Sequence, residues 1–580
     1  MTSNKEIIRR STSTKKNNFD VTLSPLMQRV YAARGVVDDT QLDYSLSKLH
    51  PVTALKGIDS AVQLLAQALT EQQHIMIVAD FDADGATSCT VAMRALRMMG
   101  AGKVSYLVPN RFEYGYGLTP EIVELAREQQ PNLIVTVDNG ISSIDGVNVA
   151  KNLGIKVLVT DHHLPGEVLP DADAIVNPNQ PGDEFPSKNL AGVGVIFYVM
   201  LALRTYLRES GWFEQQGIVE PNLATLLDIV ALGTVADVVP LDYNNRILVS
   251  QGLARIRRGM CCAGISALLN IGKRNPVNIV ASDLGFAVGP RLNAAGRLED
   301  MSLGIECLLA DDPDVAMLLA QRLDELNRER REIEGEMQTQ ALECLANIKL
   351  DINDASAPVG LCLFDESWHQ GVVGIVASRI KDRYHRPVIA FALANSNTDS
   401  TDVEIKGSAR SIKGIHMRDV LDTVAAKHPG LLTRFGGHAM AAGMTLKAAD
   451  FKAFEAAFNQ ALRCCVDDEI LQDVIHSDGE LESDEFSLEL AEALRAGGPW
   501  GQAFPEPVFD GDFEVVQQRI VAEKHLKLVL QPMGSGNTVD AIAFNHSDVV
   551  GDQLHAVFRL DVNEYMGRRT VQLMIEYIAS

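Results

Sequence analysis

The segment from about residue 73 to residue 178 alternates short apolar runs with stretches of helical periodicity. Apolar, β-branched runs at 74–79, 104–108, 133–137 and 155–160 predict strands, and helical spacing follows the first three of them. Strands that alternate with helices at this spacing predict a mainly parallel sheet whose two faces are both covered. This part of the chain is therefore expected to be an α/β domain.

The middle of the chain predicts a long helix and a second α/β region. Between Asp312 and Ile348, apolar residues recur at helical spacing opposite a charged face, and Pro313 suits the first turn of a helix. At 1.5 Å per residue such a helix would span roughly 50 Å and connect two lobes. The region from about 355 to 465 begins with a strand-like run and contains the segments GSARS and GGHAMAAG. GGHAMAAG is expected to place Gly436, Gly437 and His438 directly before a helix.

The two ends of the chain differ in character. The last hundred residues contain five short runs of alternating polarity separated by turn residues, which predict a small closed barrel of the OB type. The first 18 residues are polar and basic without an apolar core, so they are no secretory signal, and we predict a disordered tail. No apolar run reaches the roughly 18 residues that a membrane-spanning helix needs.

These patterns together predict a multidomain α/β protein. A mainly parallel-sheet domain is joined by a long helix to a second α/β domain, and an OB-like β-barrel follows at the C-terminus. A chain of 580 residues is too long for one core, which agrees with several domains. The expected boundaries are 1–55 for a tail and small helical segment, 56–310 for the first domain, 311–350 for the helix, 351–465 for the second domain and 466–580 for the barrel.

Charge and cysteine content narrow the class of function. The net charge of −24 disfavours non-specific binding of nucleic acid over the whole surface. A polyanionic partner would therefore require locally concentrated basic residues and the help of metal ions. Eight cysteines without C-x-x-C spacing predict reduced thiols in a cytosolic protein, and they argue against structural zinc and a disulfide framework.

Acidic and imidazole side chains follow three of the predicted strands. They are Asp80, Asp82 and Asp84 after the first strand, Asp138 after the third, and Asp161, His162 and His163 after the fourth, while Asp237 follows a further apolar run. In open α/β sheets, ligands bind outside the carboxyl ends of the strands. We therefore expect at least four carboxylates and one or two imidazoles to gather at one edge of the sheet.

Carboxylates this close together repel one another unless a cation lies among them. Oxygen ligands suit Mg²⁺ or Mn²⁺, and imidazole shifts the preference toward Mn²⁺. Six or more ligands suffice for two ions about 3.5–4 Å apart, and such a pair activates water against a phosphoryl group. A single aspartate after a strand is more often a turn former or a helix cap. The ordered set favours metal binding, and the hypothesis is hydrolysis of a phosphate ester.

Several motifs resemble those of a known family. DFDADG, VDNG, DHH and GTVADVVPL, in this order, resemble the four motifs of the DHH phosphoesterase superfamily, and GGHAMAAG resembles the glycine-rich motif of the DHH-associated domain. GPRLNAAGR (289–297) and WHQGVVGIVASR (368–379) are similar to segments of the bacterial single-stranded-DNA-specific exonucleases within it. The resemblance covers about residues 25–575. It implies two-metal hydrolysis of single-stranded DNA in the 5′-to-3′ direction to 5′-mononucleotides, with Mn²⁺ or Mg²⁺, in DNA repair and recombination.

The resemblance also implies roles for individual residues at the metal centre. The expected metal ligands are Asp80, Asp82, Asp84, Asp138, His162 and Asp237, with Asp138 bridging two ions and Asp80 either a ligand or a supporting residue. Asp161 would orient its neighbour by a hydrogen bond, and His163 would face the scissile phosphate. These last two are the expected catalytic residues.

A second group of residues is expected to bind the substrate. Arginine presents a planar fork that suits phosphate, so Arg410, with Ser408, would hold a terminal 5′-phosphate. The other expected substrate contacts are Arg291, Arg297, His369, Gly436, Gly437 and His438, the glycines through close approach of the backbone to phosphate. A surface salt bridge is the alternative for Arg410, a tight packing turn for the glycines, and a packed structural histidine for His369.

Two other functions stay open from the sequence. The chain could be a DHH-type phosphodiesterase acting on short oligonucleotides, cyclic dinucleotides or pyrophosphate, or a non-catalytic DNA-binding scaffold. Length, the connector and the barrel favour the nuclease, since basic and aromatic residues on an OB-fold bind single strands. The family resemblance implies single-stranded DNA, a single-stranded-DNA-binding protein and a helicase as partners, with no membrane. We expect a monomer in the bacterial cytoplasm, at the nucleoid when working.

Overall fold

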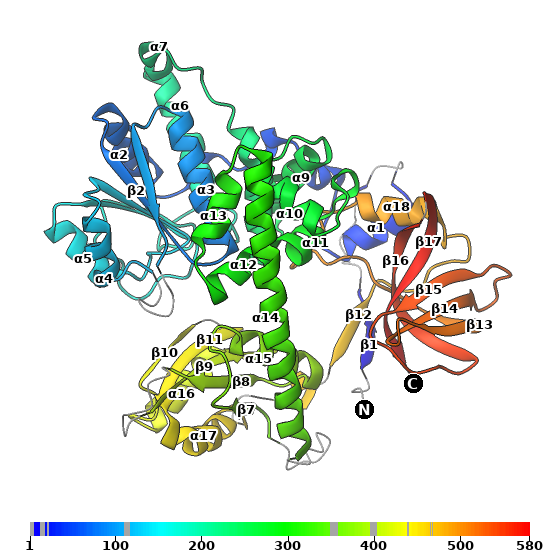
Figure 1. Ribbon diagram of the computed structural model, residues 1–580. Helices are drawn as coiled ribbons and strands as arrows, with labels where there is room; N and C mark the ends of the chain where they lie inside the picture. Colours follow the sequence, from blue (N-terminus) through cyan, green and yellow to red (C-terminus); the bar gives the residue numbers. More distant parts are fainter. Residues whose placement is uncertain are drawn as a thin grey trace. The chain divides into compact units, whose positions relative to one another are not determined.

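The computed structural model describes the chain except for residues 1–4, 12–17, 20–22, 110–116, 348–357, 395–402, 438–439, 464–465, 467, 472, 566 and 580. The chain forms two compact units (Figure 1). One unit, called unit 1, comprises residues 1–9, 328–477 and 579–580, and the other, called unit 2, comprises residues 10–327 and 478–578. The candidate functional residues of the sequence divide between these units.

The first α/β domain belongs to unit 2 and is built on a five-stranded parallel sheet. Its strand order is β3-β2-β4-β5-β6, and every neighbouring pair is parallel. The strands are β2 (His74–Ala79), β3 (Lys103–Leu107), β4 (Leu133–Val137), β5 (Lys156–Thr160) and β6 (Ala174–Val176). β2 and β4 are buried throughout, as expected for a sheet covered on both faces. The predicted parallel α/β class is confirmed.

Helices cover both faces of this sheet. One face packs against α2 (Ile58–Thr70), α3 (Ala83–Met98) and α6 (Gly192–Glu209), and the other against α4 (Pro120–Arg127) and α5 (Ile144–Asn152). The remaining helices of the domain are α7 (Trp212–Gln216), α8 (Leu227–Ala236), α9 (Tyr243–Arg257), α10 (Ala263–Ile271), α11 (Ala281–Asp283), α12 (Gly289–Leu298) and α13 (Ser302–Leu309). α3, α8 and α12 contact one another.

The long helix and the C-terminal barrel are present as predicted. α14 runs from Pro313 to Asn347. The barrel, part of unit 2, closes in the strand order β13-β14-β15-β17-β16 (Figure 1). The barrel strands are β13 (Phe509–Val521), β14 (His525–Pro532), β15 (Val539–Ala543), β16 (Gln553–Tyr565) and β17 (Arg568–Ala579). Unit 2 also contains the helices α1 (Pro25–Ala32) and α18 (Leu488–Ala496).

The second α/β domain, in unit 1, contains a mixed five-stranded sheet in the order β10-β11-β9-β8-β7. Its strands are β7 (Leu361–Phe364), β8 (Val388–Leu393), β9 (Glu404–Arg410), β10 (Arg434–Gly437) and β11 (Ala441–Lys447). One face packs against α15 (Val373–Tyr384), and the other against α16 (Met417–Lys427) and α17 (Phe451–Arg463). β9 therefore lies in the middle of the sheet with a helix on each side.

Two local predictions are wrong. No helix follows GGHAMAAG directly, because Gly436 and Gly437 end β10 and pair antiparallel with β11. Small apolar residues suit either element, and here β11 gains a full ladder with β9. The tail is not disordered throughout, because Glu6–Arg9 forms β1 and pairs with β12 (Val474–Ser477). That partner lies far along the chain, where local sequence gives no indication of it.

The structure also bears on the predictions about membrane-spanning helices and cysteines. Among the described residues, no helix is both long and apolar enough to cross a membrane. The cysteines that the structure reports as free are Cys89, Cys261, Cys262, Cys307 and Cys362.

Candidate metal centre and terminal-phosphate site

The carboxyl ends of three neighbouring strands carry the predicted acidic residues. β2, β4 and β5 are adjacent in the sheet, so the residues that follow Ala79, Val137 and Thr160 meet at one edge. Asp237 arrives there from a different element, because it caps the C-terminus of α8 rather than ending a strand. We call Asp80, Asp82, Asp84, Asp138, His162 and Asp237 the acidic cluster.

The acidic cluster forms overlapping groups that could each hold a metal ion. The groups are Asp80, Asp82 and Asp138; Asp84, His162 and Asp237; and Asp138, His162 and His163. Within each group the ligand atoms lie within 4.8 Å of one another. His162 Nε2 lies 3.1 Å from Asp138 Oδ1 and 3.4 Å from Asp237 Oδ2. The structure thus brings all six predicted ligands together, and Asp138 is shared between groups.

Burial makes this cluster electrostatically costly without a cation. Burial, followed by the charge of Asp82, raises the pKa of Asp84 to about 7, although backbone amides oppose the shift. Burial and the neighbouring carboxylates also raise the pKa of Asp138 and of Asp237 well above the ordinary value. Asp237 Oδ2 is buried and accepts no hydrogen bond from the residues that the structure describes. Divalent cations would relieve both the repulsion and this unmet acceptor, so the residues fit a metal site.

Asp161 has a different environment from the other acids. Its Oδ1 accepts hydrogen bonds from the backbone N–H groups of His162 (2.7 Å) and His163 (3.1 Å), and its Oδ2 accepts one from Ile141 (2.9 Å). The same Oδ1 lies 2.8 Å from His163 Nδ1. Burial is the largest single effect and opposes ionisation, but the hydrogen bond and charge of His163, the charge of His162 and the Ile141 amide together lower the pKa of Asp161. Asp161 therefore holds the ring of His163, and the catalytic roles of both residues stay predictions.

His163 is held as a cation in the absence of metal. Burial would lower its pKa, but the hydrogen bond and charge of Asp161 dominate and raise the pKa of His163 to about 9. Its Nδ1 is used by Asp161. The opposite edge of the ring can therefore present a hydrogen-bond donor to an anionic group.

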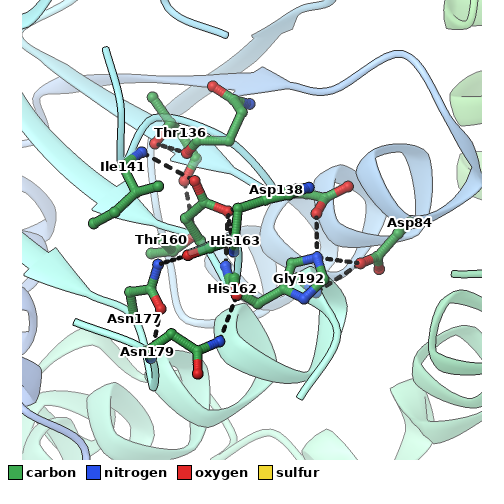
Figure 2. A network of polar contacts seen from close by, with 12 residues as sticks. Asp84, Thr136, Asp138, Ile141, Thr160, His162, His163, Asn177, Asn179 and Gly192 are labelled. Carbon is green, nitrogen blue, oxygen red and sulfur yellow. Dashed lines mark hydrogen bonds and ion pairs between the residues drawn. The ribbon is translucent and has the colours of Figure 1, made fainter. Parts of the chain in front are cut away.

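Asparagine side chains that sequence reasoning missed hold the backbone of this site. Asn177 Nδ2 donates to His163 O (2.9 Å) and Asn179 Nδ2 donates to His162 O (2.7 Å), as Figure 2 shows. Asn139 Nδ2 donates to Val78 O (3.1 Å) and Val137 O (2.9 Å), which fixes the turn after β4 against β2. The N-P-N sequence at 177–179, just after β6, is the signal that could have indicated two of them.

The N-terminus of α6 supports Asp84. The amides of Gly192 and Val193 donate to its two carboxylate oxygens at 2.6 and 3.0 Å. A helix N-terminus favours negative charge, so this contact stabilises the buried carboxylate. Gly192 is also in close contact with Asp138, because an added Cβ would lie 2.6 Å from Asp138 Cβ and 2.7 Å from its Oδ1. Only glycine fits between these two acids without displacing one.

The segment GPRLNAAGR forms α12 and contacts the metal-binding loop. Asn293 Oδ1 accepts a hydrogen bond from the backbone N–H of Ala83, the first residue of α3, at 2.8 Å. Asp82 Oδ1 accepts from the next two amides of that helix. An added Cβ on Gly296 would lie 1.9 Å from the backbone oxygen of Phe81. α12 therefore packs directly on the loop that carries Asp80, Asp82 and Asp84.

The two predicted substrate-binding arginines of α12 differ in environment. Arg291 is 8% exposed, and its Nη2 lies 2.8 Å from Asp324 Oδ1 while its Nε donates to the same oxygen. Its Nη1 also donates to Ala287 O. Arg297 lies in the last turn of α12 and is partly exposed. Arg291 thus contacts other residues of the protein in this structure. Substrate binding by Arg291 and Arg297 stays a prediction.

In unit 1, the predicted phosphate-binding residues lie on β9 and β10. Arg410 Nη1 donates to Ser408 Oγ (3.0 Å) and to Ala409 O (2.8 Å). Gly436 of β10 pairs with Gly443 of β11, which in turn pairs with Ser408. We call Ser408 and Arg410, whose binding of a terminal phosphate stays a prediction, the terminal-phosphate site.

Two histidines complete the set of predicted substrate contacts. His369 Nδ1 accepts a hydrogen bond from the backbone N–H of Gly371 (3.1 Å), and burial lowers the pKa of His369. This arrangement favours a neutral ring at neutral pH. His438 lies outside the described residues.

Comparison with known families matches three parts of the chain. A model described as the DHH family, N-terminal domain, matches residues 74–234, the DHHA1 domain matches residues 357–463, and the RecJ OB domain matches residues 477–577. The acidic cluster except Asp237 lies in the first range, and the terminal-phosphate site lies in the second.

Similarity to characterised relatives extends over nearly the whole chain. The single-stranded-DNA-specific exonuclease RecJ of Salmonella typhimurium is 52% identical over 98% of both chains. The RecJ of Bacillus subtilis is 34% identical over 90% of this chain and 63% of its own. The crystal structure of RecJ in complex with Mn²⁺ from Thermus thermophilus is similar with a TM-score of 0.78 at 28% identity, covering 96% of this chain and 76% of that chain. Its Mg²⁺ complex gives a TM-score of 0.72 at the same identity, covering 96% and 75%.

Proposed function

Because the chain belongs to the RecJ family of single-stranded-DNA-specific exonucleases, we propose that it is a metal-dependent exonuclease acting on single-stranded DNA. Hydrolysis proceeds in the 5′-to-3′ direction and releases 5′-mononucleotides. The observation that carries the proposal is the position of Asp138, which belongs to one group of ligand atoms with Asp80 and Asp82 and to another with His162 and His163. A site for a single ion needs no such shared carboxylate.

Two Mn²⁺ or Mg²⁺ ions are the proposed cofactors. Asp80, Asp82, Asp84, Asp138, His162 and Asp237 would hold them, with Asp138 common to both. When bound, the ions lower the pKa of a coordinated water and neutralise charge on the attacked phosphate. Asp161 holds the ring of His163 through Nδ1, so that a protonated ring would offer a donor to a phosphate oxygen. Asn177 and Asn179 hold the backbone of both histidines in register with the acids.

Directionality is proposed to come from unit 1. Ser408 aligns the guanidinium of Arg410, which can bind a terminal phosphate, and recognition of that end of the strand would give the reaction its direction. Gly436, Gly437, His438 and His369 are the proposed neighbours of this phosphate, and Arg291 and Arg297 the proposed contacts of the strand. The five segments 1–55, 56–310, 311–350, 351–465 and 466–580 remain the proposed domains.

The proposed setting is DNA repair and recombination. Family membership supports single-stranded DNA as the substrate. We further propose a monomer that acts at the bacterial nucleoid, with a single-stranded-DNA-binding protein and a strand-supplying helicase as partners. These finer assignments are supported by the family resemblance alone.

Alanine at Asp138 tests the proposal. Hydrolysis of a single-stranded oligonucleotide with Mn²⁺ should be abolished by Asp138→Ala, and calorimetry should show fewer than two bound ions. Asp145→Ala is the matched control, because Asp145 is an exposed aspartate in the first turn of α5. It should leave both activity and stoichiometry unchanged. Retained hydrolysis by the Asp138 variant in a clean preparation would contradict the metal assignment.

A further inference from the structure

We propose that Gly374, the second residue of α15, positions the Arg410 guanidinium and thereby sets the preference for strands that carry a 5′-phosphate. Gly374 is a positioning residue, because it would act on the substrate only through Arg410. The inference rests on the proposed function, which assigns the terminal phosphate to Ser408 and Arg410. It adds a specificity determinant on a different element of the fold.

α15 covers the face of β9 that carries the terminal-phosphate site. Ser408 and Arg410 are two residues apart on a strand, so their side chains leave the same face of the sheet. Ala390 of β8, the register partner of Ser408, packs in one cluster with residues of α15. The intervening Ala409 packs on the opposite face with α16 and α17. The start of α15 therefore meets the side chains of Ser408 and Arg410.

The contact between Gly374 and the site leaves no room for a methyl group. An added Cβ would lie 2.7 Å from Arg410 Nη2, 2.9 Å from Ser408 Oγ and 3.4 Å from Arg410 Cζ. All three nearest atoms belong to the two side chains of the terminal-phosphate site. Only the absence of a side chain at residue 374 allows the guanidinium to lie where it does.

Alanine at Gly374 should have a different effect from alanine at other closely packed glycines. At Gly296 the nearest atom is a backbone oxygen, so an alanine there must move the main chain. At Gly374 the nearest atom is the end of a flexible arginine side chain, which can move at little cost to the fold. Alanine is also a better helix former than glycine. Gly374→Ala should therefore keep the fold intact while displacing the guanidinium.

The surroundings leave space for a ligand next to Ser408. Its register partner on β11 is Gly443, which is exposed, and a Cβ added there would meet no atom within 4 Å. The next partner across the sheet is Gly436 of β10. A strip of sheet without side chains thus lies beside the terminal-phosphate site. The first N–H groups of α15, which have no intrahelical acceptor, add positive potential at the same end.

The test compares two single-stranded oligonucleotides that differ only in a 5′-phosphate or a 5′-hydroxyl. For each protein the ratio of the two kcat/KM values is measured with Mn²⁺. Gly374→Ala should lower the wild-type ratio by about tenfold or more, as expected when a charge-assisted contact is lost. Its Tm should be unchanged or higher. Gly335→Ala is the matched control, because Gly335 lies in α14 and an added Cβ meets no atom within 4 Å.

A double-mutant cycle separates positioning from a general structural effect. In an Arg410→Ala background, adding Gly374→Ala should change the ratio by less than about twofold, since the guanidinium is already gone. Additive effects of the two substitutions would overturn the inference. A wild-type ratio in Gly374→Ala would overturn it as well.

Fluorescence anisotropy with the same two oligonucleotides in the absence of metal gives a readout that does not depend on hydrolysis. The binding preference for the phosphorylated strand should fall in Gly374→Ala and persist in Gly335→Ala. Wild-type protein that prefers the phosphorylated strand but hydrolyses neither would refute the proposed function and leave this inference standing. Wild-type protein that binds both strands equally would refute the role of Arg410 and the inference with it.

Discussion

Replacing Asn293 with alanine should weaken metal binding although Asn293 is not a proposed ligand. Its Oδ1 accepts the hydrogen bond from Ala83 N–H at 2.8 Å, at the start of α3. Ala83 lies between Asp82 and Asp84, so this bond fixes the loop that carries both acids. Removing it releases the first amide of α3 and lets the loop move relative to Asp138.

Two independent comparisons give the expected loss of Mn²⁺ affinity in Asn293→Ala. Loss of a side-chain cap on a helix N-terminus costs about 0.5–2 kcal/mol. Substitution of residues that support metal ligands from outside the coordination sphere reduces metal affinity about 10–100-fold, or about 1.4–2.7 kcal/mol. The ranges overlap near 1.5–2 kcal/mol by these estimates. Asn293→Ala should therefore weaken Mn²⁺ binding by at least about tenfold.

Calorimetric titration with Mn²⁺ in the absence of DNA measures this affinity directly. Asn222→Ala is a matched control, because Asn222 Oδ1 accepts a similar amide hydrogen bond (3.1 Å) from Ala224, at the start of the short 3₁₀ helix η4 (Leu223–Leu226) that precedes α8. High Mn²⁺ should restore much of the hydrolysis rate of Asn293→Ala. An unchanged dissociation constant together with lost activity would refute the reasoning and favour direct contact of Asn293 with the strand.

Three further predictions concern the same unit. The raised pKa values of Asp84, Asp138 and Asp237 mean that protons occupy part of the cluster near neutral pH, so Mn²⁺ must displace them. The apparent affinity for Mn²⁺ should therefore rise from about pH 6 to about pH 8. Calorimetric titration in buffers of different ionisation enthalpy should show proton release, and a pH-independent affinity would contradict the raised pKa values. Arg291→Met removes the buried ion pair between Arg291 and Asp324, so chemical denaturation should show a loss of about 3–5 kcal/mol in the free energy of unfolding, whereas wild-type stability would show that the pair is dispensable. Gly192→Ala places a methyl 2.6 Å from Asp138 Cβ and should lower kcat about 100-fold in a steady-state assay; full activity would argue against a shared role of Asp138.

The acidic cluster could be predicted because its residues follow recognisable strands. Apolar runs placed Asp80, Asp138 and Asp161 at strand ends, and parallel topology then brings such ends to one edge. Asp237 was expected in the cluster because it follows a further apolar run, but that run is the helix α8, so Asp237 joins the cluster from the end of a helix. The chemistry of the centre was thus predictable, while the division of ligands between ions was not.

The supporting residues could not be predicted from local sequence. Asn293 contacts Ala83 across 210 residues of chain, and no periodicity connects two such segments. For the same reason, the arginines of GPRLNAAGR were predicted to contact the DNA strand. In the structure, Arg291 instead pairs with Asp324. Tertiary pairing also overrides propensity at β11, where an alanine-rich segment completes a sheet instead of forming a helix.

Digestion of a single-stranded oligonucleotide labelled in turn at each end tests the central claim most directly. With Mn²⁺ present, the 5′-labelled strand should release labelled mononucleotide from the earliest times, while the 3′-labelled strand shortens progressively. Chelation of the metal should stop the reaction, and a blunt duplex should stay intact. An untouched single strand, or mononucleotide released first from the 3′ end, would contradict a metal-dependent 5′-to-3′ exonuclease.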